Sequence, residues 1–600
     1  MQAHSLRSPG RRGIVAAILM GAAIAVASAT VAAAAATNNK VVPVGIDVVV
    51  TGVSGEHLRN VLAHLDIWQQ RKSTDLKAGH VAKLHRLAPK QIATALQPFG
   101  YYQPTITASL RRDGETWRAS YTIDIGTPVP ITSLDIQLLG AGASDAKLGQ
   151  LTTSPELRVG SPLDHRQYEE LKARLLDTAI AEGYLDADYE AHRMTIDLDD
   201  YQAAIILHLD TGNLYHVGDV DFDQSGPIHL SAELLRRFVT FPANTPLTSE
   251  LTLNLQTALT NSGYFRSVEI VPQKDKASND IVPLQVKLAT DSRSKYRFGA
   301  GFGTDTGARG SVTHERLVNE RGHQLSLKAE IAQRNSAADM RYSIPLQDPV
   351  NSHLEFSSGI SEMQTDSRES RNLHVGVART RLRGAWRETL GVTAEYEDYE
   401  VGDIDDTSKL LFPNANWTRT VSNHPLFPTH GWHLNLNLLG AAESLGSDVS
   451  FAQGRIDGKW LTTYAERNRL IARAALGATG TSSFTELPPS KRFFAGGDNS
   501  VRGYDFEALG TTDADGDVVG GRYLAVGSLE YERLLTASWG AAVFYDVGNA
   551  FNSMNESFGR AVGIGARWRT PIGLVRLDVA RPLTDSDSAY RIHLVIGPEL

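Results

Sequence analysis

Two hydrophobic periods divide this chain. Up to about residue 290, apolar residues recur at helical spacing in segments that alternate with short stretches of period two. Beyond Asp291 the period is two throughout. Alternate positions near the start of this part are apolar: Tyr296, Phe298, Ala300 and Phe302. The chain therefore predicts mixed α/β modules followed by a large β-domain.

Three helix-like segments end in the same signature. They are residues 89–99, 164–182 and 249–262. The signatures that follow them are Gly100-Tyr101, Gly183-Tyr184 and Gly263-Tyr264. Glycine just past a helix takes the left-handed conformation that ends it, and the aromatic residue can fold back on the helix. Because the signatures recur roughly every 80 residues, we expect three repeated modules, each with two strands after its helix.

The second part predicts a membrane β-barrel. One face of each strand is apolar or aromatic, whereas the other carries glycine, arginine and carboxylate. A sandwich would bury its apolar face, but a membrane barrel turns that face to lipid around a polar interior. Apart from the N-terminus we find no apolar run of about 18 residues, so a closed barrel is the expected way to cross a membrane. About 310 residues predict on the order of 16 strands.

The N-terminus and the composition indicate where the protein is located and which class of partner it does not bind. Arg7, Arg11 and Arg12 precede an uncharged stretch, 13–36, that is typical of a secretory signal peptide, with a retained anchor as the alternative. The 59 basic residues against 68 acidic ones do not favour a nucleic-acid partner. The absence of cysteine suits an oxidising compartment.

These patterns predict five segments. They are a signal peptide at 1–36, modules at 41–127, 128–212 and 213–290, and a barrel at 291–600.

The four residues Val501-Arg502-Gly503-Tyr504 lie in a glycine-rich loop of the barrel. Alternation in the strands after the loop points Glu530 and Asp546 into the lumen, on consecutive strands where they would repel each other without a cation. A guanidinium can meet carboxylates through two parallel hydrogen bonds. We predict that the loop folds inward and places Arg502 on both acids; a solvated loop tip is the alternative.

The Val-Arg-Gly-Tyr loop and the two strand carboxylates resemble the superfamily of outer-membrane barrels that insert or secrete proteins. The helix–Gly–Tyr signature is similar to that of the POTRA modules of this superfamily. Three modules and the terminus Ile596-Gly597-Pro598-Glu599-Leu600 look most like the TamA family, outer-membrane subunits of the translocation and assembly module. That resemblance implies a barrel in the outer membrane with its modules in the periplasm. It also implies a TamB-like partner anchored in the inner membrane, autotransporters among the clients, and Arg502 packed on the strand acids.

The first and last barrel strands predict a weak closing seam. The first has Gly299, Gly301 and Gly303 on its lumen face, and the last ends in Gly597-Pro598. Glycine stabilises a strand poorly and proline donates no ladder hydrogen bond. An under-bonded seam is a latent edge where a client strand can pair. Plain barrel curvature is the other explanation for the glycines.

Other functions are less well matched. A passive porin has no soluble repeats, a two-partner secretion transporter usually has two modules, and the general barrel-assembly subunit usually has five. An enzyme is not expected, because we find no G-x-S-x-G, no H-E-x-x-H and no Walker loop. We predict no cofactor, no metal site and no nucleic-acid partner.

Overall fold

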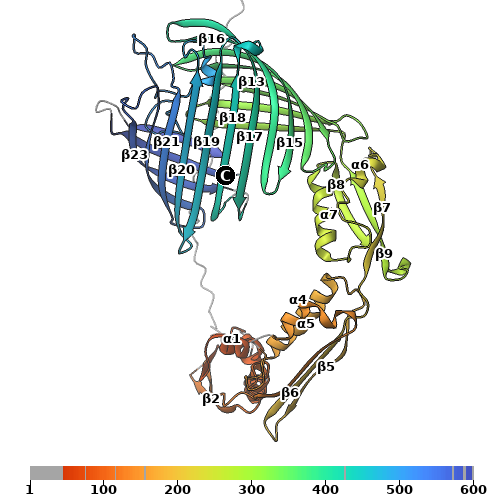
Figure 1. The fold of residues 1–600 in the computed structure, drawn as a ribbon. Coiled ribbons are helices and arrows are strands. Elements are labelled where there is room, and N and C mark those ends of the chain that lie inside the picture. The colour runs from red at the N-terminus through yellow and green to blue at the C-terminus, as the bar shows by residue number, and fades with distance from the viewer. Residues whose placement is uncertain are drawn as a thin grey trace, which may run out of the picture. The chain divides into compact units, whose positions relative to one another are not determined.

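The computed structural model describes residues 45–597, apart from 74–75, 115, 154–156, 425–426, 571–572 and 585–589. The predicted signal peptide and Pro598 therefore lie outside the described residues. The described residues form three small α/β sheets followed by a closed antiparallel barrel (Figure 1), which confirms the predicted fold class. By its contacts the chain separates into two compact units, one with β1–β3 and the other with β7 and the barrel, and the second module is divided between them.

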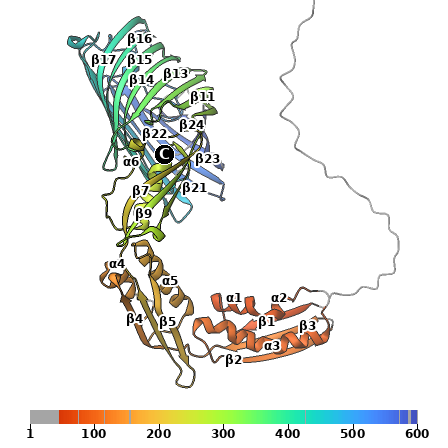
Figure 2. The ribbon, with the colours of Figure 1, turned by 90° about the vertical axis from the view of Figure 1, so that its right-hand side faces the viewer.

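Each module is a three-stranded sheet with helices. The first has β1 (Ile46–Thr51), α1 (Gly55–His64), α2 (Asp66–Gln69), α3 (Ala78–Leu96), β2 (Thr105–Asp113) and β3 (Thr116–Asp124). The second has β4 (Ile131–Leu139), α4 (Ala146–Thr152), α5 (His165–Ala181), β5 (Asp188–Asp197) and β6 (Gln202–Asp210). The third has β7 (His216–Ser225), α6 (Ala232–Arg236), α7 (Ser249–Asn261), β8 (Phe265–Pro272) and β9 (Ile281–Thr290). Figure 2 shows the helices of the first module lying along its sheet.

The sheet order is the same in all three modules. The last strand is central, as in β1-β3-β2, β4-β6-β5 and β7-β9-β8. In the first and third modules the opening strand runs parallel to the central one and the middle strand antiparallel. The strands β1, β4 and β7 were not predicted, because the glycine signatures indicate only the strands that follow them. These opening strands complete each sheet.

The prediction for the first helix was wrong at its start. α3 begins at Ala78 and contains Pro89, which was taken as its first residue. Proline favours a helix start, but here the apolar period already runs through Val81 and Leu84, and burial of that face holds the preceding turns. The helical signature glycines Gly100, Gly183 and Gly263 all have positive φ, of 84°, 104° and 73°.

The glycine signatures also hold the segment that follows each module. A backbone N–H from that segment donates to a carbonyl of the signature in each case: Val129 to Gly100 (2.9 Å), Tyr215 to Gly183 (3.0 Å) and Asp291 to Tyr264 (3.0 Å). In the third module the Tyr264 hydroxyl also donates to the carbonyl of Gly322, in a barrel turn, at 2.8 Å. The repeated signature therefore ends a helix and fixes the exit of the chain.

The described residues from Ser294 to Gly597 form a barrel of sixteen strands. They are β10 (Ser294–Gly303), β11 (Gly307–Leu317), β12 (Gln324–Ala332), β13 (Asn335–Pro345), β14 (Ser352–Gln364), β15 (Arg368–Arg383), β16 (Trp386–Val401), β17 (Ile404–Ser422), β18 (His430–Ala441), β19 (Phe451–Tyr464), β20 (Asn468–Thr481), β21 (Tyr523–Leu534), β22 (Trp539–Phe551), β23 (Gly559–Thr570), β24 (Gly573–Pro582) and β25 (Arg591–Gly597). Every neighbouring pair is antiparallel.

Alternation along the barrel strands separates an apolar outer face from a polar lumen. Phe298 is 79% exposed and Leu529 53%, whereas the inward Glu530 is 4% exposed. In water such an outer face would be unfavourable, so its solvent is lipid. No helix in the described part of the chain has the length and apolar character needed to cross a membrane.

Candidate functional site

The site forms where the long loop between β20 and β21, residues 482–522, folds into the lumen. Short bridges join Phe493 to Gly521 and Ala495 to Leu509 within this loop. The Phe493 ring lies against Gly477 of β20, where a Cβ atom would come within 2.5 Å of the ring. A glycine at this position of the strand is therefore required for the loop to pack against the wall.

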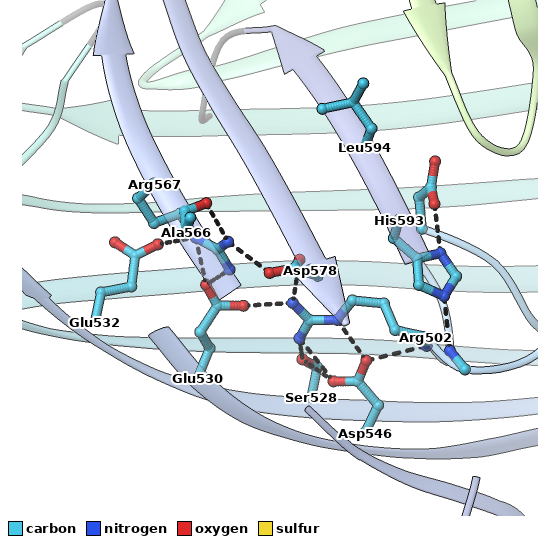
Figure 3. A network of polar contacts seen from close by, with 12 residues as sticks. Arg502, Ser528, Glu530, Glu532, Asp546, Ala566, Arg567, Asp578, His593 and Leu594 are labelled. Atoms are coloured by element: carbon cyan, nitrogen blue, oxygen red, sulfur yellow. Dashed lines mark hydrogen bonds and ion pairs between the residues drawn. The ribbon is translucent and has the colours of Figure 1, made fainter. Parts of the chain in front are cut away.

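Arg502 lies at the centre of the site and is 1% exposed. Its guanidinium donates to Asp546 of β22 (2.7 and 2.9 Å) and to Glu530 of β21 (2.7 Å). A third carboxylate, Asp578 of β24, accepts at 3.0 Å. The cation also lies 3.3 Å from the centre of the Phe544 ring. Figure 3 shows these acids converging on Arg502 from three strands.

The rest of the four-residue motif fits the same wall. Val501 is fully buried, and the Tyr504 hydroxyl donates to the carbonyl of Arg560 at 3.3 Å. Gly503 has a φ of 96°, and a Cβ there would meet the side chain of Ala561 at 3.2 Å. A residue with a side chain at this position would be strained in its backbone and crowded by β23.

A second cation, Arg567 of β23, completes a network that sequence reasoning missed. It contacts Glu530, Glu532 (2.7 Å) and Asp578 (2.5 Å). Glu532 also pairs with Arg469, and Arg473 lies 4.0 Å from Asp546. Four arginines thus face four acids in the lumen, and their formal charges cancel. Buried ions are tolerated only with such compensation.

The signal for the missing members was present in the alternation of β23 and β24. Ile564 and Trp568 are exposed on the outer face, so Arg567 between them must point inward. In β24, Leu577 is exposed and Asp578 buried. Only the two strands directly after the loop were considered, although consecutive hairpins place β23 and β24 on the same wall.

The closing seam between β10 and β25 contrasts with every other strand pair. Its strand register has one partner pair, Gly303 with Val595, whereas β10 has ten partners on β11 and β25 has seven on β24. Two further hydrogen bonds join Thr304 to Leu594: the Thr304 N–H to the Leu594 carbonyl (3.3 Å) and the Leu594 N–H to the Thr304 hydroxyl (3.1 Å). Among the described residues, the seam is the least bonded junction of the barrel.

The loop spans this seam through His593 of β25. The Gly503 N–H donates to His593 Nε2 at 2.8 Å, so Nε2 is unprotonated and the Nδ1 proton is donated to Asp498 at 2.6 Å. Asp498, in the loop, also accepts from the Thr304 hydroxyl at 2.7 Å. Side chains therefore connect the last strand to the turn after the first strand where backbone pairing is nearly absent.

Asp305, in the same turn, adds a titratable contact. Its carboxylate accepts from the Asp498 N–H at 2.6 Å. Burial, and then the nearby charge of Asp498, raise the pKa of Asp305 to about 6. Ligand atoms of Asp305, Asp498 and His593 lie within 4.8 Å of one another, but the hydrogen bonds above already occupy the His593 nitrogens. The three side chains therefore fit a hydrogen-bonded contact across the seam better than a metal site.

The predicted seam glycines lie where β11 side chains cross the strand. A Cβ at Gly299 would meet the Ser311 hydroxyl at 2.6 Å, and one at Gly301 would meet Arg309 Nε at 2.8 Å. Gly597 ends β25, and Pro598 follows outside the described residues.

Sequence profiles identify both halves of this architecture. Residues 318–599 match the Omp85 superfamily domain, and residues 47–125 match the POTRA domain described as TamA domain 1. The fold and its polar lumen define an outer-membrane β-barrel with periplasmic modules, which confirms the predicted location. More narrowly, residues 318–599 are similar to the Omp85 superfamily domain, and they follow α/β modules of which the first is similar to a POTRA domain.

Individual relatives agree with this assignment. The chain is 25% identical over 351 residues to the outer membrane protein assembly factor BamA of Nitratidesulfovibrio vulgaris, covering 54% of this chain and 44% of that protein. It is 25% identical over 416 residues to the chloroplastic outer envelope protein 80 of Oryza sativa, covering 61% and 59%. The chain thus spans about half the length of the curated relatives it matches.

The fold also matches a solved structure. The crystal structure of BamA from Haemophilus ducreyi lacking POTRA domains 1–3 superimposes with a TM-score of 0.64 at 17% identity, covering 78% of this chain and 99% of that one.

Proposed function

We propose that this protein is an outer-membrane assembly factor of the TamA type, which inserts or translocates client β-barrel proteins such as autotransporters. In this proposal the β10–β25 seam parts, and a client strand pairs with the exposed edge before it passes into lipid. The POTRA modules receive clients and a TamB-like partner anchored in the inner membrane.

The observation that carries the proposal is the contrast in bonding around the barrel. Among the described residues one register pair joins β10 to β25, whereas the other edges of these two strands have ten and seven pairs with β11 and β24. Unpaired backbone groups at such an edge favour the addition of an extended strand. The loop contacts at His593 and Asp498 hold this edge closed with side chains that can release without breaking a ladder.

Two features favour the TamA type over its relatives. The described chain has three modules, and the first matches a TamA-type POTRA profile. A two-partner secretion transporter and a general barrel-assembly subunit remain alternatives within the superfamily. Depletion of the protein separates them, because a loss confined to autotransporter-like surface proteins supports the TamA type and a loss of most outer-membrane barrels supports the general subunit.

A seam disulfide tests the mechanism. The chain has no cysteine, so Gly303→Cys with Val595→Cys, the single register pair, would form the only possible bridge. The control is Ala337→Cys with Ser361→Cys, two inward residues paired across β13 and β14. We expect the oxidised seam variant to lose client assembly and to recover it on reduction, while the control keeps assembly in both states. Undiminished assembly by the oxidised seam variant would contradict the proposal.

A further inference from the structure

A basic and aromatic patch lies on the outer wall of the barrel, at one end of β15, β16 and β17. Leu373, Val375 and Val377 of β15 are exposed on the lipid face. Continuing the same alternation places three arginines on that face: Arg379, Arg381 and Arg383. Arginine is costly on a lipid-facing strand near the bilayer centre and much less so near its surface. This end of the strands therefore lies at a membrane interface.

The strand register gathers aromatic residues beside these arginines. Arg381 is opposite Glu388 of β16, which is opposite Trp417 of β17. Arg383 is opposite Trp386, and Arg419 follows two residues after Trp417 on the same face. Figure 1 shows β15, β17 and β18 on one side of the barrel. Tryptophan concentrates where lipid headgroups begin, which agrees with the position inferred from the arginines.

The patch is at the periplasmic end of the barrel. Turns at this end contact the third module, through the hydrogen bonds of Tyr264 to Gly322 and of Arg237 to Leu346 (3.0 Å). The turn between β15 and β16 is at the same end, because antiparallel hairpins return to it every second strand. The lipid that meets the patch is therefore the periplasmic leaflet.

The cations of the patch outnumber its acids. Glu388 accepts from Arg381 (2.6 Å), Arg383 (3.4 Å) and the Trp417 indole N–H (3.0 Å), and it is 2% exposed. Within the described residues Arg379 and Arg419 have no ion-pair partner. Four arginines against one glutamate leave a surplus of three positive charges.

Arg419 gives the most specific indication of a ligand. Its guanidinium lies 5.1 Å from the centre of the Trp432 ring, and its Nε is buried without a hydrogen-bond acceptor. Because Nε is covered, an acceptor from outside the chain would meet the terminal nitrogens of this guanidinium, which have no hydrogen bond to a described residue. An acceptor that arrives from lipid at headgroup height and meets several guanidinium groups is a phosphate.

We propose that this patch binds the phosphate headgroup of an anionic phospholipid of the periplasmic leaflet, with the acyl chains lying on the wall beside Val377 and Leu390. The patch is about half-way round the barrel from the seam, because eight strand steps separate β17 from β25. Bound lipid would hold this wall at a fixed depth in the leaflet.

The test compares the thermal unfolding of the full chain in vesicles of phosphatidylcholine with and without phosphatidylglycerol. The variant is Arg379→Gln, Arg383→Gln and Arg419→Gln together, which leaves the Arg381–Glu388 pair in place. The charge-matched control is Arg59→Gln, Arg86→Gln and Arg193→Gln, three exposed residues of the modules. We expect phosphatidylglycerol to raise the unfolding temperature of the wild type and the control, and the patch variant to lose more than half of that rise.

Three further results test the proposed lipid site. A patch variant with the full rise, or a wild type with none, would overturn the proposal. Inorganic phosphate that gives the same rise in pure phosphatidylcholine would do so too, because a free anion would then suffice. The triple Arg→Lys variant at the same positions guards against misfolding: it keeps the charge and is expected to keep part of the rise, and its complete loss of the rise in a folded barrel would contradict an electrostatic site.

Discussion

The wall from β21 to β24 and the seam between β10 and β25 are joined in opposite ways. The wall has complete backbone ladders, with twelve register pairs between β21 and β22 alone, and its lumen face is crossed by the ion pairs of Arg502 and Arg567. In the described part of the chain the seam has one register pair and relies on His593, Asp498 and Thr304. The same loop touches both regions. Backbone pairing thus makes the wall rigid, while exchangeable side-chain contacts hold the seam.

The difference has an energetic basis. A buried ion network adds little net stability when intact but is strongly destabilising when one partner is removed, so it fixes the position of the loop. Single hydrogen bonds contribute about 0.5–1.5 kcal/mol each, which is within reach of a competing strand. The loop is therefore held firmly at the wall and loosely at the seam.

The largest expected effect comes from the wall. Arg502→Ala leaves three carboxylates buried without their shared cation, and we expect a loss of about 3–5 kcal/mol in the free energy of unfolding. The loss of stability is measured by the unfolding temperature and by the heat-modifiable mobility of the barrel on gels. Arg502→Lys keeps a charge but not the paired hydrogen bonds, so it should lose less.

Arg522→Ala is the matched control within the same loop. The Arg522 guanidinium has a ring contact with Phe484 at 5.5 Å, so a change well under that of Arg502→Ala is expected. Equal losses from the two variants would show that Arg502 is not the anchor.

At the seam, His593→Ala removes the acceptor of Gly503 and the donor to Asp498. We expect a cost of about 1–3 kcal/mol, because the buried Gly503 N–H loses its partner. More frequent openings in bilayer conductance traces are the readout. Arg591→Ala on the same strand removes an exposed pair with Asp505 and should cost about 0–1 kcal/mol. An unchanged frequency of openings in His593→Ala would show that the contact between the loop and His593 does not keep the seam closed.

Asp305 predicts a pH dependence of the seam. Its pKa is raised to about 6 in the folded protein, above its ordinary value of 3.8. The folded state therefore binds the proton more tightly, and stability falls as the pH rises from about 4 to 6. Seam openings should therefore become more frequent as the pH rises over this range. Asp305→Asn keeps an oxygen acceptor for the Asp498 N–H but does not titrate, so it should abolish this change in opening frequency. An unchanged slope would place the titrating group elsewhere.

Gly303→Ala should have the smallest effect. Its Cβ would meet the Thr306 hydroxyl at 3.2 Å, a contact that a small shift relieves. Because alanine restricts the unfolded chain more than glycine, we expect a stabilisation of about 0.4–1 kcal/mol and slightly rarer openings. More frequent openings would mean that the glycine is needed for the closed seam itself.

Period-two alternation made much of this structure predictable. It fixed the inward direction of Glu530 and Asp546 and the outward direction of Phe298. The partners Arg567 and Asp578 required knowledge of which strands share a wall, and alternation alone does not supply it. The start of α3 was misjudged because Pro89 acts locally as a helix-start residue, whereas tertiary burial decides the outcome. The contacts of His593 depend on barrel closure between residues far apart in the chain.

Hydrogen–deuterium exchange on the full chain in lipid vesicles compares the backbone protection of the seam with that of the wall. We predict fast exchange for the amides of β10 and β25 that face the seam, and slow exchange for those between β21 and β24. Arg502→Lys should speed exchange in the loop before it affects the wall. Equal protection of the seam and the wall would contradict the claim that the barrel parts between its first and last strands.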